Sequence, residues 1–232
     1  MLAGRIGRIA LLPLIAVLAL LAACTSSTPA EQLPAASDLL AKSAAAMRTV
    51  KTAAIDIQVD QALNAIAVRR ATGTLTAAGE AKGTATLAQG GTLAEFEFVI
   101  AGGDLYLKGP TGAYRKVPLV FAASIYDPSA ILNPDKGVAR LLSTTADAKT
   151  EARESVNGAD AYRVRANLDQ QAVSALVPGI SGRVSGLLWL DAGTSRLVKA
   201  QLDVPTGNGS ATAPATVTFS NYDAPVTITP PS

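Results

Sequence analysis

The sequence predicts an α+β domain in which helices lie on one face of a large antiparallel sheet. Many short runs alternate apolar and polar residues with a period of two, and glycine-containing turns separate these runs. Four other segments show helical spacing, and they do not alternate regularly with the strands. Such an order is typical of helices segregated to one face of an antiparallel sheet. The 232 residues suit one domain with a sizeable core.

The N-terminus predicts an export signal with a lipidation site. Arg5 and Arg8 precede an apolar run at 9–21, and small residues then lead to Cys24, the only cysteine. A transmembrane helix is the alternative, but it needs about 20 apolar residues. A cysteine directly after the cleavage site can carry covalent acyl groups, which would anchor the chain. We therefore expect a lipoprotein signal peptide at 1–23, a flexible tether at 24–36 and a folded domain at 37–230.

Composition excludes several classes of function. Residues 1–23 carry two arginines and no acidic residue, so the rest of the chain has 18 basic and 18 acidic residues. This balance argues against a nucleic-acid partner. Histidine is absent, which excludes the usual zinc sites and the nucleophilic systems that depend on histidine. We expect no enzyme, no metal and no cofactor, and a lipid-acting enzyme that uses carboxylates stays open as an alternative.

The first half of the domain reads as one helix followed by strands. Ser37 is expected to cap a helix that runs to about Val50, with its apolar residues on one face. From Ala53 the period changes to two. Glycines punctuate the strands that follow, which predicts tight turns and an antiparallel meander. These strands are expected at 55–60, 68–75, 84–87, 95–98 and 105–108.

The second half mixes short helices and strands. We expect a loop at 125–128, a short helix at 129–132 and a helix that starts at Asp135 and runs to 142. Asn157-Gly158 predicts a tight hairpin turn, and a helix is expected at 168–177 before Pro178. Residues 207–214 are expected to form a loop. The strands of this half are expected at 162–165, 187–191, 197–204, 217–222 and 226–228.

Several segments carry a family likeness. They are 123–129 (ASIYDPS), 132–138 (LNPDKGV), 146–149 (ADAK), 188–190 (LWL), 197–202 (LVKAQL) and 218–222 (TFSNY). In this order the chain resembles the LprG/LprA/LprF/LppX family of mycobacterial (actinobacterial) lipoproteins, and LprG most of all. Two places depart from the family pattern: Tyr222 stands where the family usually has Trp, and 109–120 is richer in Lys and Arg.

The resemblance implies a strongly curved antiparallel sheet, a half-barrel, with helices closing its concave face over an apolar cavity. It implies a cargo of acylated lipids, either triacylated glycolipids or triacylglycerides, that the protein carries across or out of the cell envelope. It also implies a lipid-anchored protein on the inner membrane that faces the periplasm or cell wall. A major-facilitator efflux pump is the implied partner, and we expect a monomer.

With the family in view, the inward-facing apolar residues become candidates for the cavity. Ordinary core packing is the alternative for each, and a structural or interaction lipoprotein with a solid core is the alternative for the whole. If Ala85 lines the cavity, Ala85→Trp should block lipid binding. The mouth loop is expected at Ile125, Tyr126, Asp127 and Pro128. The cavity candidates are Ile55, Ile57, Val59, Ala85, Leu87, Phe96, Phe98, Leu105, Leu107, Ile131, Leu132, Val138, Leu141 and Leu142.

Overall fold

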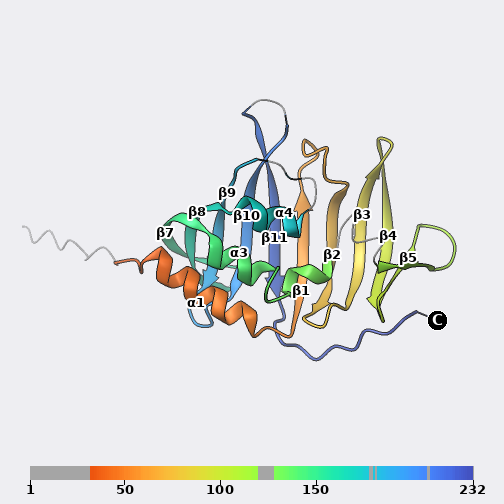
Figure 1. Ribbon diagram of the computed structural model, residues 1–232, viewed down its shortest axis with the longest axis horizontal. Coiled ribbons are helices and arrows are strands. Elements are labelled where there is room, and N and C mark those ends of the chain that lie inside the picture. Colours follow the sequence, from red (N-terminus) through yellow and green to blue (C-terminus); the bar gives the residue numbers. More distant parts are fainter. Residues whose placement is uncertain (1–31, 120–127, 178–179, 181, 208–209, 232) are drawn as a thin grey trace, which may run out of the picture. The chain divides into compact units, whose positions relative to one another are not determined.

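A single antiparallel sheet dominates the computed structural model, which describes residues 32–119, 128–177, 180, 182–207 and 210–231 (Figure 1). From Leu33 onward the described residues form one compact unit. The sheet has eleven strands, and every neighbouring pair is antiparallel. In chain order the strands are β1 (Thr52–Val59), β2 (Val68–Thr76), β3 (Ala81–Gln89), β4 (Thr92–Ala101), β5 (Asp104–Lys108), β6 (Arg115–Pro118), β7 (Ala146–Val156), β8 (Ala159–Leu168), β9 (Val184–Asp191), β10 (Leu197–Pro205) and β11 (Thr212–Ser220).

The first and last strands meet in the middle of the sheet. The spatial order is β6-β5-β4-β3-β2-β1-β11-β10-β9-β8-β7. Only the β1–β11 pair joins strands that are distant in sequence, with Ile55 opposite Phe219 and Ile57 opposite Val217. β6 and β7 are left as the two edges, so the sheet is curved but not closed. This arrangement confirms the predicted α+β fold with an open antiparallel sheet.

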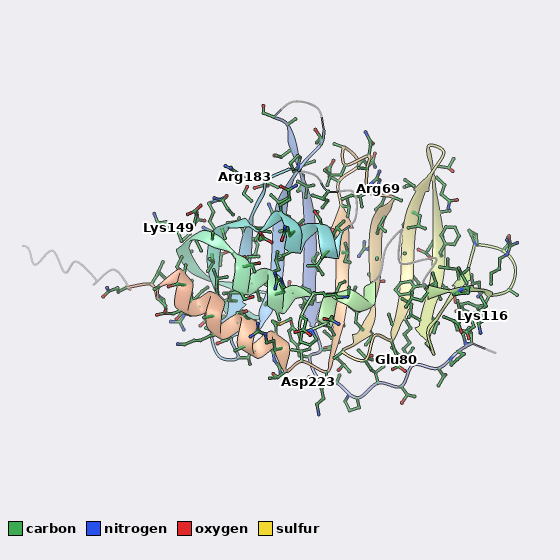
Figure 2. The ribbon with its side chains drawn as sticks, viewed as in Figure 1. Arg69, Glu80, Lys116, Lys149, Arg183 and Asp223 are labelled. Atoms are coloured by element: carbon green, nitrogen blue, oxygen red, sulfur yellow. The ribbon has the colours of Figure 1, made fainter. Side chains whose placement is uncertain are left out.

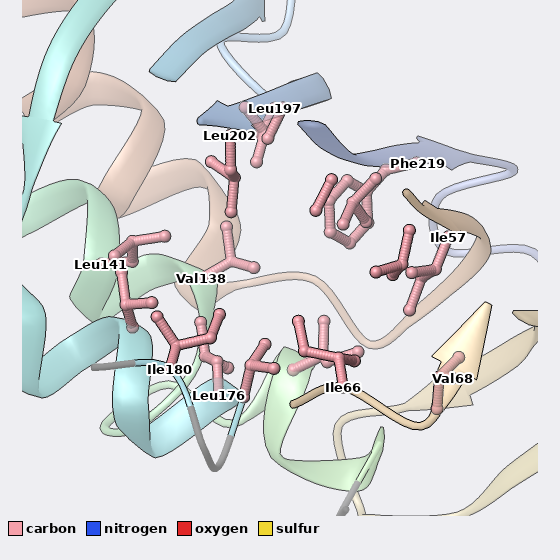
Figure 3. A pocket seen from close by; sticks show the side chains of 17 residues that line it. Ile57, Ile66, Val68, Val138, Leu141, Leu176, Ile180, Leu197, Leu202 and Phe219 are labelled. Atoms are coloured by element: carbon pink, nitrogen blue, oxygen red, sulfur yellow. The ribbon is translucent and has the colours of Figure 1, made fainter. Parts of the chain in front are cut away.

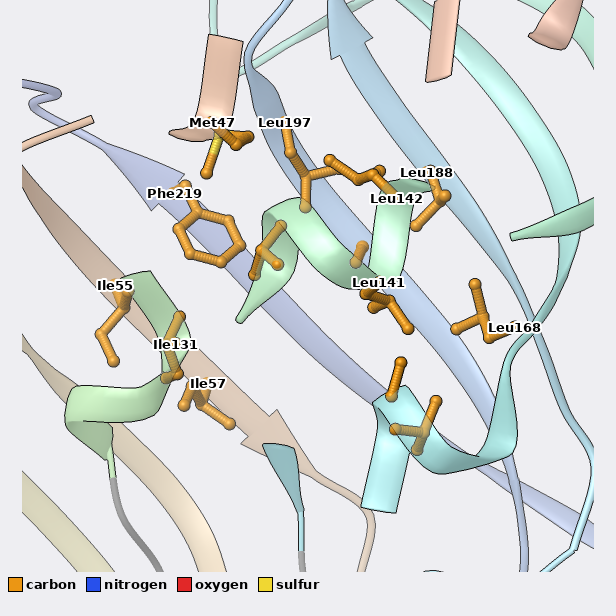
Figure 4. Packing of buried hydrophobic residues seen from close by; sticks show 14 of the residues in the cluster. Met47, Ile55, Ile57, Ile131, Leu141, Leu142, Leu168, Leu188, Leu197 and Phe219 are labelled. Carbon is orange, nitrogen blue, oxygen red and sulfur yellow. The ribbon is translucent and has the colours of Figure 1, made fainter. Parts of the chain in front are cut away.

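The helices of the described residues lie over the same face of the sheet (Figure 1). They are α1 (Ala36–Arg48), the 3₁₀ helix η1 (Pro128–Leu132), α3 (Val138–Thr144) and α4 (Gln170–Leu176). All helices in the described part of the chain are too short or too polar to span a bilayer. The buried core lies between this layer and the sheet, where Met47, Leu142, Leu188, Leu197 and Phe219 belong to one cluster (Figure 4).

Two helix starts differ from the expectation. The prediction that Ser37 caps α1 is wrong, because the helix begins at Ala36 and its N-cap, Ala35, makes no side-chain capping bond. The helix expected from Asp135 begins only at Val138. The Asn133 Oδ1 atom accepts hydrogen bonds from the backbone N–H groups of Asp135 and Lys136, at 2.9 and 3.0 Å. These bonds hold residues 133–136 in a turn, which delays the helix.

The strand assignments also need correction. The prediction of a strand at 226–228 is wrong, because these residues form no strand. Pro225 and the prolines at 230–231 flank them and cannot donate ladder hydrogen bonds. β11 begins at Thr212, inside the expected loop at 207–214. β6 and β7 were not expected at all. In β7 the register shifts twice, once between 146 and 149 and once between 150 and 152, and this breaks the alternation that marks a strand.

Candidate functional site

A cavity of about 110 Å³ lies between the middle of the sheet and the helices (Figure 3). In Figure 3 the lining side chains point toward a common centre from the sheet on one side and the helices on the other. Every residue that lines it, in the part of the chain that the structure describes, is apolar. They are Ile57, Val59, Ile66, Val68, Ile131, Val138, Leu141, Val173, Leu176, Val177, Ile180, Leu197, Ala200, Leu202, Ala215, Val217 and Phe219.

The sheet wall is built from lateral rows of neighbours. Ile57 of β1 lies opposite Val217 of β11, which lies opposite Ala200 of β10. The next row places Val59 opposite Ala215 in the same way, and it ends at Leu202 of β10. Because side chains alternate between the faces of a strand, residues two apart on each strand enter the same cavity. The central β1–β11 pair therefore brings the two ends of the domain together at this wall.

The helical wall satisfies its polar groups locally and turns apolar side chains inward. Asp169 caps α4 by accepting from the Ala172 backbone N–H at 2.9 Å. Within α4, the Ser174 hydroxyl donates at 3.1 Å to the carbonyl of Ile180, which lines the cavity. At the other side, the Gly137 N–H donates to the Asn133 carbonyl at 2.8 Å and leads into α3.

The described residues that line the cavity carry no polar side chain. Among these described lining residues there is no ionisable or hydroxyl group, and so no carboxylate pair. Among the described residues, no cluster of three or more metal-ligating His, Cys, Asp or Glu side chains occurs. An apolar cavity of this kind stays dry and accepts apolar ligands. The arrangement therefore favours binding of hydrocarbon.

The size of the cavity limits what it holds in this conformation. An engineered apolar cavity of about 150 Å³ holds one benzene molecule, and the present cavity is smaller, at about 110 Å³. A long acyl chain therefore requires part of the helical layer to move away from the sheet. The hydrogen bonds described above, in α4 and in the turn after η1, are local, and both elements turn apolar side chains toward the cavity.

Five of the fourteen candidates from the sequence line the cavity: Ile57, Val59, Ile131, Val138 and Leu141. The structure places the other nine elsewhere. Four are buried in the same core without lining the cavity, namely Ile55, Phe98, Leu132 and Leu142. Three are half-buried against that core, namely Ala85, Leu105 and Leu107. Leu87 and Phe96 are half-buried on β3 and β4.

The sequence candidates missed most of the cavity, because they came largely from the first half of the chain. The missed lining residues lie chiefly on β10, β11 and α4. A signal was present, since Ala215, Val217 and Phe219 alternate in the same way as Ile55 and Ile57. Cys24 and residues 125–127 of the expected mouth loop lie outside the described residues, and Pro128 is the first residue of η1.

A polar clamp fixes α1 beside the cavity. The Tyr222 hydroxyl donates to the Leu197 carbonyl and lies 3.6 Å from the Met47 sulfur. Burial raises the pKa of this phenol well above its usual range, so the hydroxyl stays a donor. Arg196 lies over the Tyr222 ring at 5.1 Å and pairs with Asp223. Leu197 lines the cavity, so the clamp joins the last turn of α1 to the cavity wall.

The backbone of Lys51, just after α1, also contacts this cluster through Asp223. It donates to the Asp223 Oδ1 atom at 2.8 Å. This bond, with the Arg196 guanidinium, lowers the pKa of Asp223. Figure 2 shows Asp223 at the end of the domain where α1 leads into β1. Tyr222, which the sequence reading set apart from the family pattern, is a structural anchor here.

The fold and its cavity place the chain among single-domain proteins with a helix-covered, open antiparallel sheet. The chain belongs to the LppX_LprAFG lipoprotein family, whose model matches residues 35–228. This confirms the resemblance seen in the sequence, and the family is one of lipoproteins and not of enzymes.

Two relatives show how far the sequence similarity extends. The "Lipoarabinomannan carrier protein LprG" of Mycolicibacterium smegmatis is 36% identical over 220 residues, which are 90% of this chain and 89% of that protein. The protein of the same name from Mycobacterium tuberculosis (strain ATCC 25618 / H37Rv) is 30% identical over 203 residues, covering 86% and 83%.

Two solved structures share the fold. LprF from Mycobacterium bovis superposes with a TM-score of 0.74 at 24% identity, covering 85% of this chain and 97% of that one. Lipoprotein LppX from Mycobacterium tuberculosis superposes with a TM-score of 0.61 at 16% identity, covering 84% and 98%. At these identities the likeness supports the half-barrel architecture alone.

Proposed function

We propose that this protein is a lipid-anchored envelope lipoprotein that holds the acyl chains of a lipid in its cavity and carries that lipid through the envelope. The observation that carries the proposal is the wholly apolar lining of the cavity. Burying hydrocarbon there returns about 25 cal/mol per Å² of apolar surface. The bilayer buries the same chains equally well, so transfer is close to balance, which suits a carrier that must also release its cargo.

The relatives support a cargo of acylated glycolipid. These relatives are named lipoarabinomannan carrier proteins, and they align with 86–90% of this chain. Triacylated glycolipids are therefore the first candidates, and triacylglycerides the second. Both present long acyl chains, and the cavity must widen to admit either.

The anchor and location follow from the N-terminal segment. Acylation of Cys24 would hold the protein on the outer surface of the inner membrane, facing the periplasm or cell wall. A major-facilitator efflux pump remains the partner implied by the sequence resemblance. Edge strands support a monomer, since β6 is short and carries Arg115, Lys116 and Pro118, while β7 is interrupted by two register shifts.

An interaction lipoprotein with a solid core is the second candidate. The small cavity volume, about 110 Å³, favours this alternative. In that case the helices stay on the sheet, and an exposed face of the domain binds an envelope protein. The two candidates differ in one measurable property, which is whether lipid travels with the purified protein.

Mass spectrometry of the full chain purified from an actinobacterial host tests the proposal. Denaturing conditions retain covalent acyl groups on Cys24, whereas native conditions also retain cargo held without a covalent bond. A native mass that exceeds the denatured mass by that of an acylated glycolipid or triacylglyceride supports the carrier. Equal masses, with no uptake on incubation with envelope lipids, favour the interaction lipoprotein. A denatured mass without acyl groups would contradict the anchor alone.

A further inference from the structure

The chain leaves and rejoins the sheet at two neighbouring residues when it forms α4. β8 ends at Leu168 and β9 begins at Val184, and these two residues lie directly opposite each other in the ladder. Surface excursions whose two ends lie close together form compact units of their own and are frequently functional. Such a unit can move while the register of β8 and β9 stays intact. We refer to residues 169–177, which contain α4, as the α4 segment.

The hydrogen bonds of the α4 segment are local. In the described part of the chain, the bonds made at 169–180 join members of this stretch to one another. The Val177 N–H, for example, donates to the Val173 carbonyl at 2.8 Å. The contact of the segment with the rest of the domain is apolar, because Ala172 and Val173 belong to the buried core and Leu176 and Val177 pack against it.

Helix α1, by contrast, is tied to the sheet region at both ends. The Thr150 hydroxyl of β7 donates to the Pro34 carbonyl at 2.7 Å, just before the helix begins. At the other end, the Met47 sulfur lies 3.6 Å from the Tyr222 hydroxyl, inside the clamp described above. α3 packs against α1. These two helices therefore form the better-fixed part of the helical layer.

The α4 segment closes one side of the apolar cavity. Leu176 and Val177 line the cavity, and so does Ile180 a few residues later. Figure 3 shows Leu176 and Ile180 across the cavity from Leu197 and Leu202 of the sheet. Displacing the segment would widen the space between the sheet and the helices, and it would cost apolar contacts and not hydrogen bonds to the sheet.

We infer that α4 is a hinged flap that swings about the Leu168–Val184 pair and widens the cavity, while α1 and α3 stay in place. The inference rests on the proposed function, because an acyl chain needs more room than the cavity of about 110 Å³ offers. It adds to that function the part of the chain that moves. Segments that share few contacts with the rest of a fold open locally far more often than the whole domain unfolds.

Hydrogen exchange of the unaltered, lipid-free full chain tests which helix opens. The informative amides are those of Val173 and Val177, whose N–H groups donate to carbonyls within the α4 segment at 3.0 and 2.8 Å. They are compared with the amides in the middle of α1, after correction for the intrinsic exchange rate of each residue. We expect the α4 amides to exchange at least tenfold faster than those of α1.

Lipid uptake by two matched variants tests whether this opening admits cargo. Asp169→Ala removes the helix cap of the α4 segment, and Thr150→Ala removes the bond that ties the start of α1. The probe is a pyrene-labelled triacylglyceride in vesicles of dioleoyl phosphatidylcholine, and pyrene fluorescence follows its transfer to the protein. Loss of the cap should raise both the α4 exchange rates and the uptake rate about fivefold. Thr150→Ala should leave the uptake rate unchanged.

Three results would overturn the inference. The first is equal protection of the α1 and α4 amides. The second is an unchanged uptake rate in Asp169→Ala although its α4 amides exchange faster, and the third is an equal gain in Thr150→Ala, which would make α1 the moving part. If the unaltered protein takes up neither this probe nor an acylated glycolipid, the proposed function fails instead, and hydrogen exchange alone still decides whether α4 opens independently of α1.

Discussion

Gly73 on β2 and Gly83 on β3 lie directly opposite each other on the concave face of the sheet. A Cβ atom on Gly83 would come within 2.0 Å of the Thr72 carbonyl oxygen and 2.7 Å of the Gly73 Cα. On Gly73, a Cβ would come within 2.4 Å of the Lys82 carbonyl oxygen. The two backbones approach closer than any side chain permits, so this glycine pair allows the sheet to bend between β1 and β4.

Gly83→Ala should therefore destabilise the domain by about 1–3 kcal/mol, because the strands must separate to admit the methyl group. Urea unfolding measures the change. Gly109→Ala is the matched control, since a Cβ there meets the Phe96 ring at an ordinary 3.6 Å. If both variants lose the same stability, the close approach of β2 and β3 is not the cause.

Filling the cavity should abolish lipid binding without unfolding the protein. Ala200 lies on the sheet wall between Val217 and Leu188, and Ala200→Phe places a ring in the void. Lipid recovered with the protein, measured by extraction and mass spectrometry, should fall at least tenfold. Ala85→Phe serves as the control, because Ala85 packs against the core but does not line the cavity. Equal loss in both variants would contradict the position of the cavity.

Bound lipid should stabilise the fold, because it binds the folded state and fills a void. At a free lipid concentration one hundred times Kd, linkage adds about 2.7 kcal/mol. For a domain of this size the Tm rises by roughly 5–10 °C. Differential scanning calorimetry with and without lipid measures the shift. A Tm that stays constant in the unaltered protein while lipid is shown to be bound would contradict the linkage.

The clamp at Asp223 should make stability depend on acid pH. The backbone N–H of Lys51 and the Arg196 guanidinium lower the pKa of Asp223 below its unfolded value of 3.8. The stabilisation is therefore present above that value and is lost as the pH falls through the lower folded-state pKa. Asp223→Asn should cost less than about 1 kcal/mol at pH 7, because the pair is partly exposed. The difference from the unaltered protein should shrink as the pH falls below 3.8, and a constant difference across this range would contradict the role of the charge.

A polar network around the buried Trp189 is expected to stabilise the convex face of the sheet. Its Nε1 atom donates to Glu154 at 2.6 Å, Glu154 pairs with Arg163, and Lys199 lies over the indole at 4.5 Å. Glu154→Ala should destabilise the domain by about 1–3 kcal/mol, because the indole N–H loses its acceptor. Glu95→Ala, an exposed strand position on β4, should change stability by less than about 0.5 kcal/mol. Equal effects would show that the network contributes nothing.

Local patterns in the sequence were sufficient to predict the fold class and most strands. Period-two alternation placed Ile55 and Ile57 on the inner face, and the structure agrees. The patterns did not predict β7, because its two register shifts interrupt the alternation of apolar and polar residues. They also failed at Ser37, whose capping chemistry the helix does not use.

The composition of the cavity could not be predicted from such patterns. It depends on β1 pairing with β11, across more than 150 residues, and no local signal reveals that partner. The pairing moves β3, β4 and β5 away from the cavity and brings β10 and β11 to it. Candidates such as Phe96 and Leu105 therefore face inward on the correct side of the sheet but lie too far along it to line the cavity.

Photo-crosslinking tests the central claim most directly, namely that acyl chains enter the cavity between the sheet and α3 and α4. The probe is a phosphatidylinositol with a diazirine near the end of one acyl chain, and peptide mass spectrometry locates the adduct. The account predicts adducts on lining residues such as Val173, Leu176 and Val217, with their loss in Ala200→Phe. Adducts confined to the exposed convex face, unchanged in that variant, would contradict it.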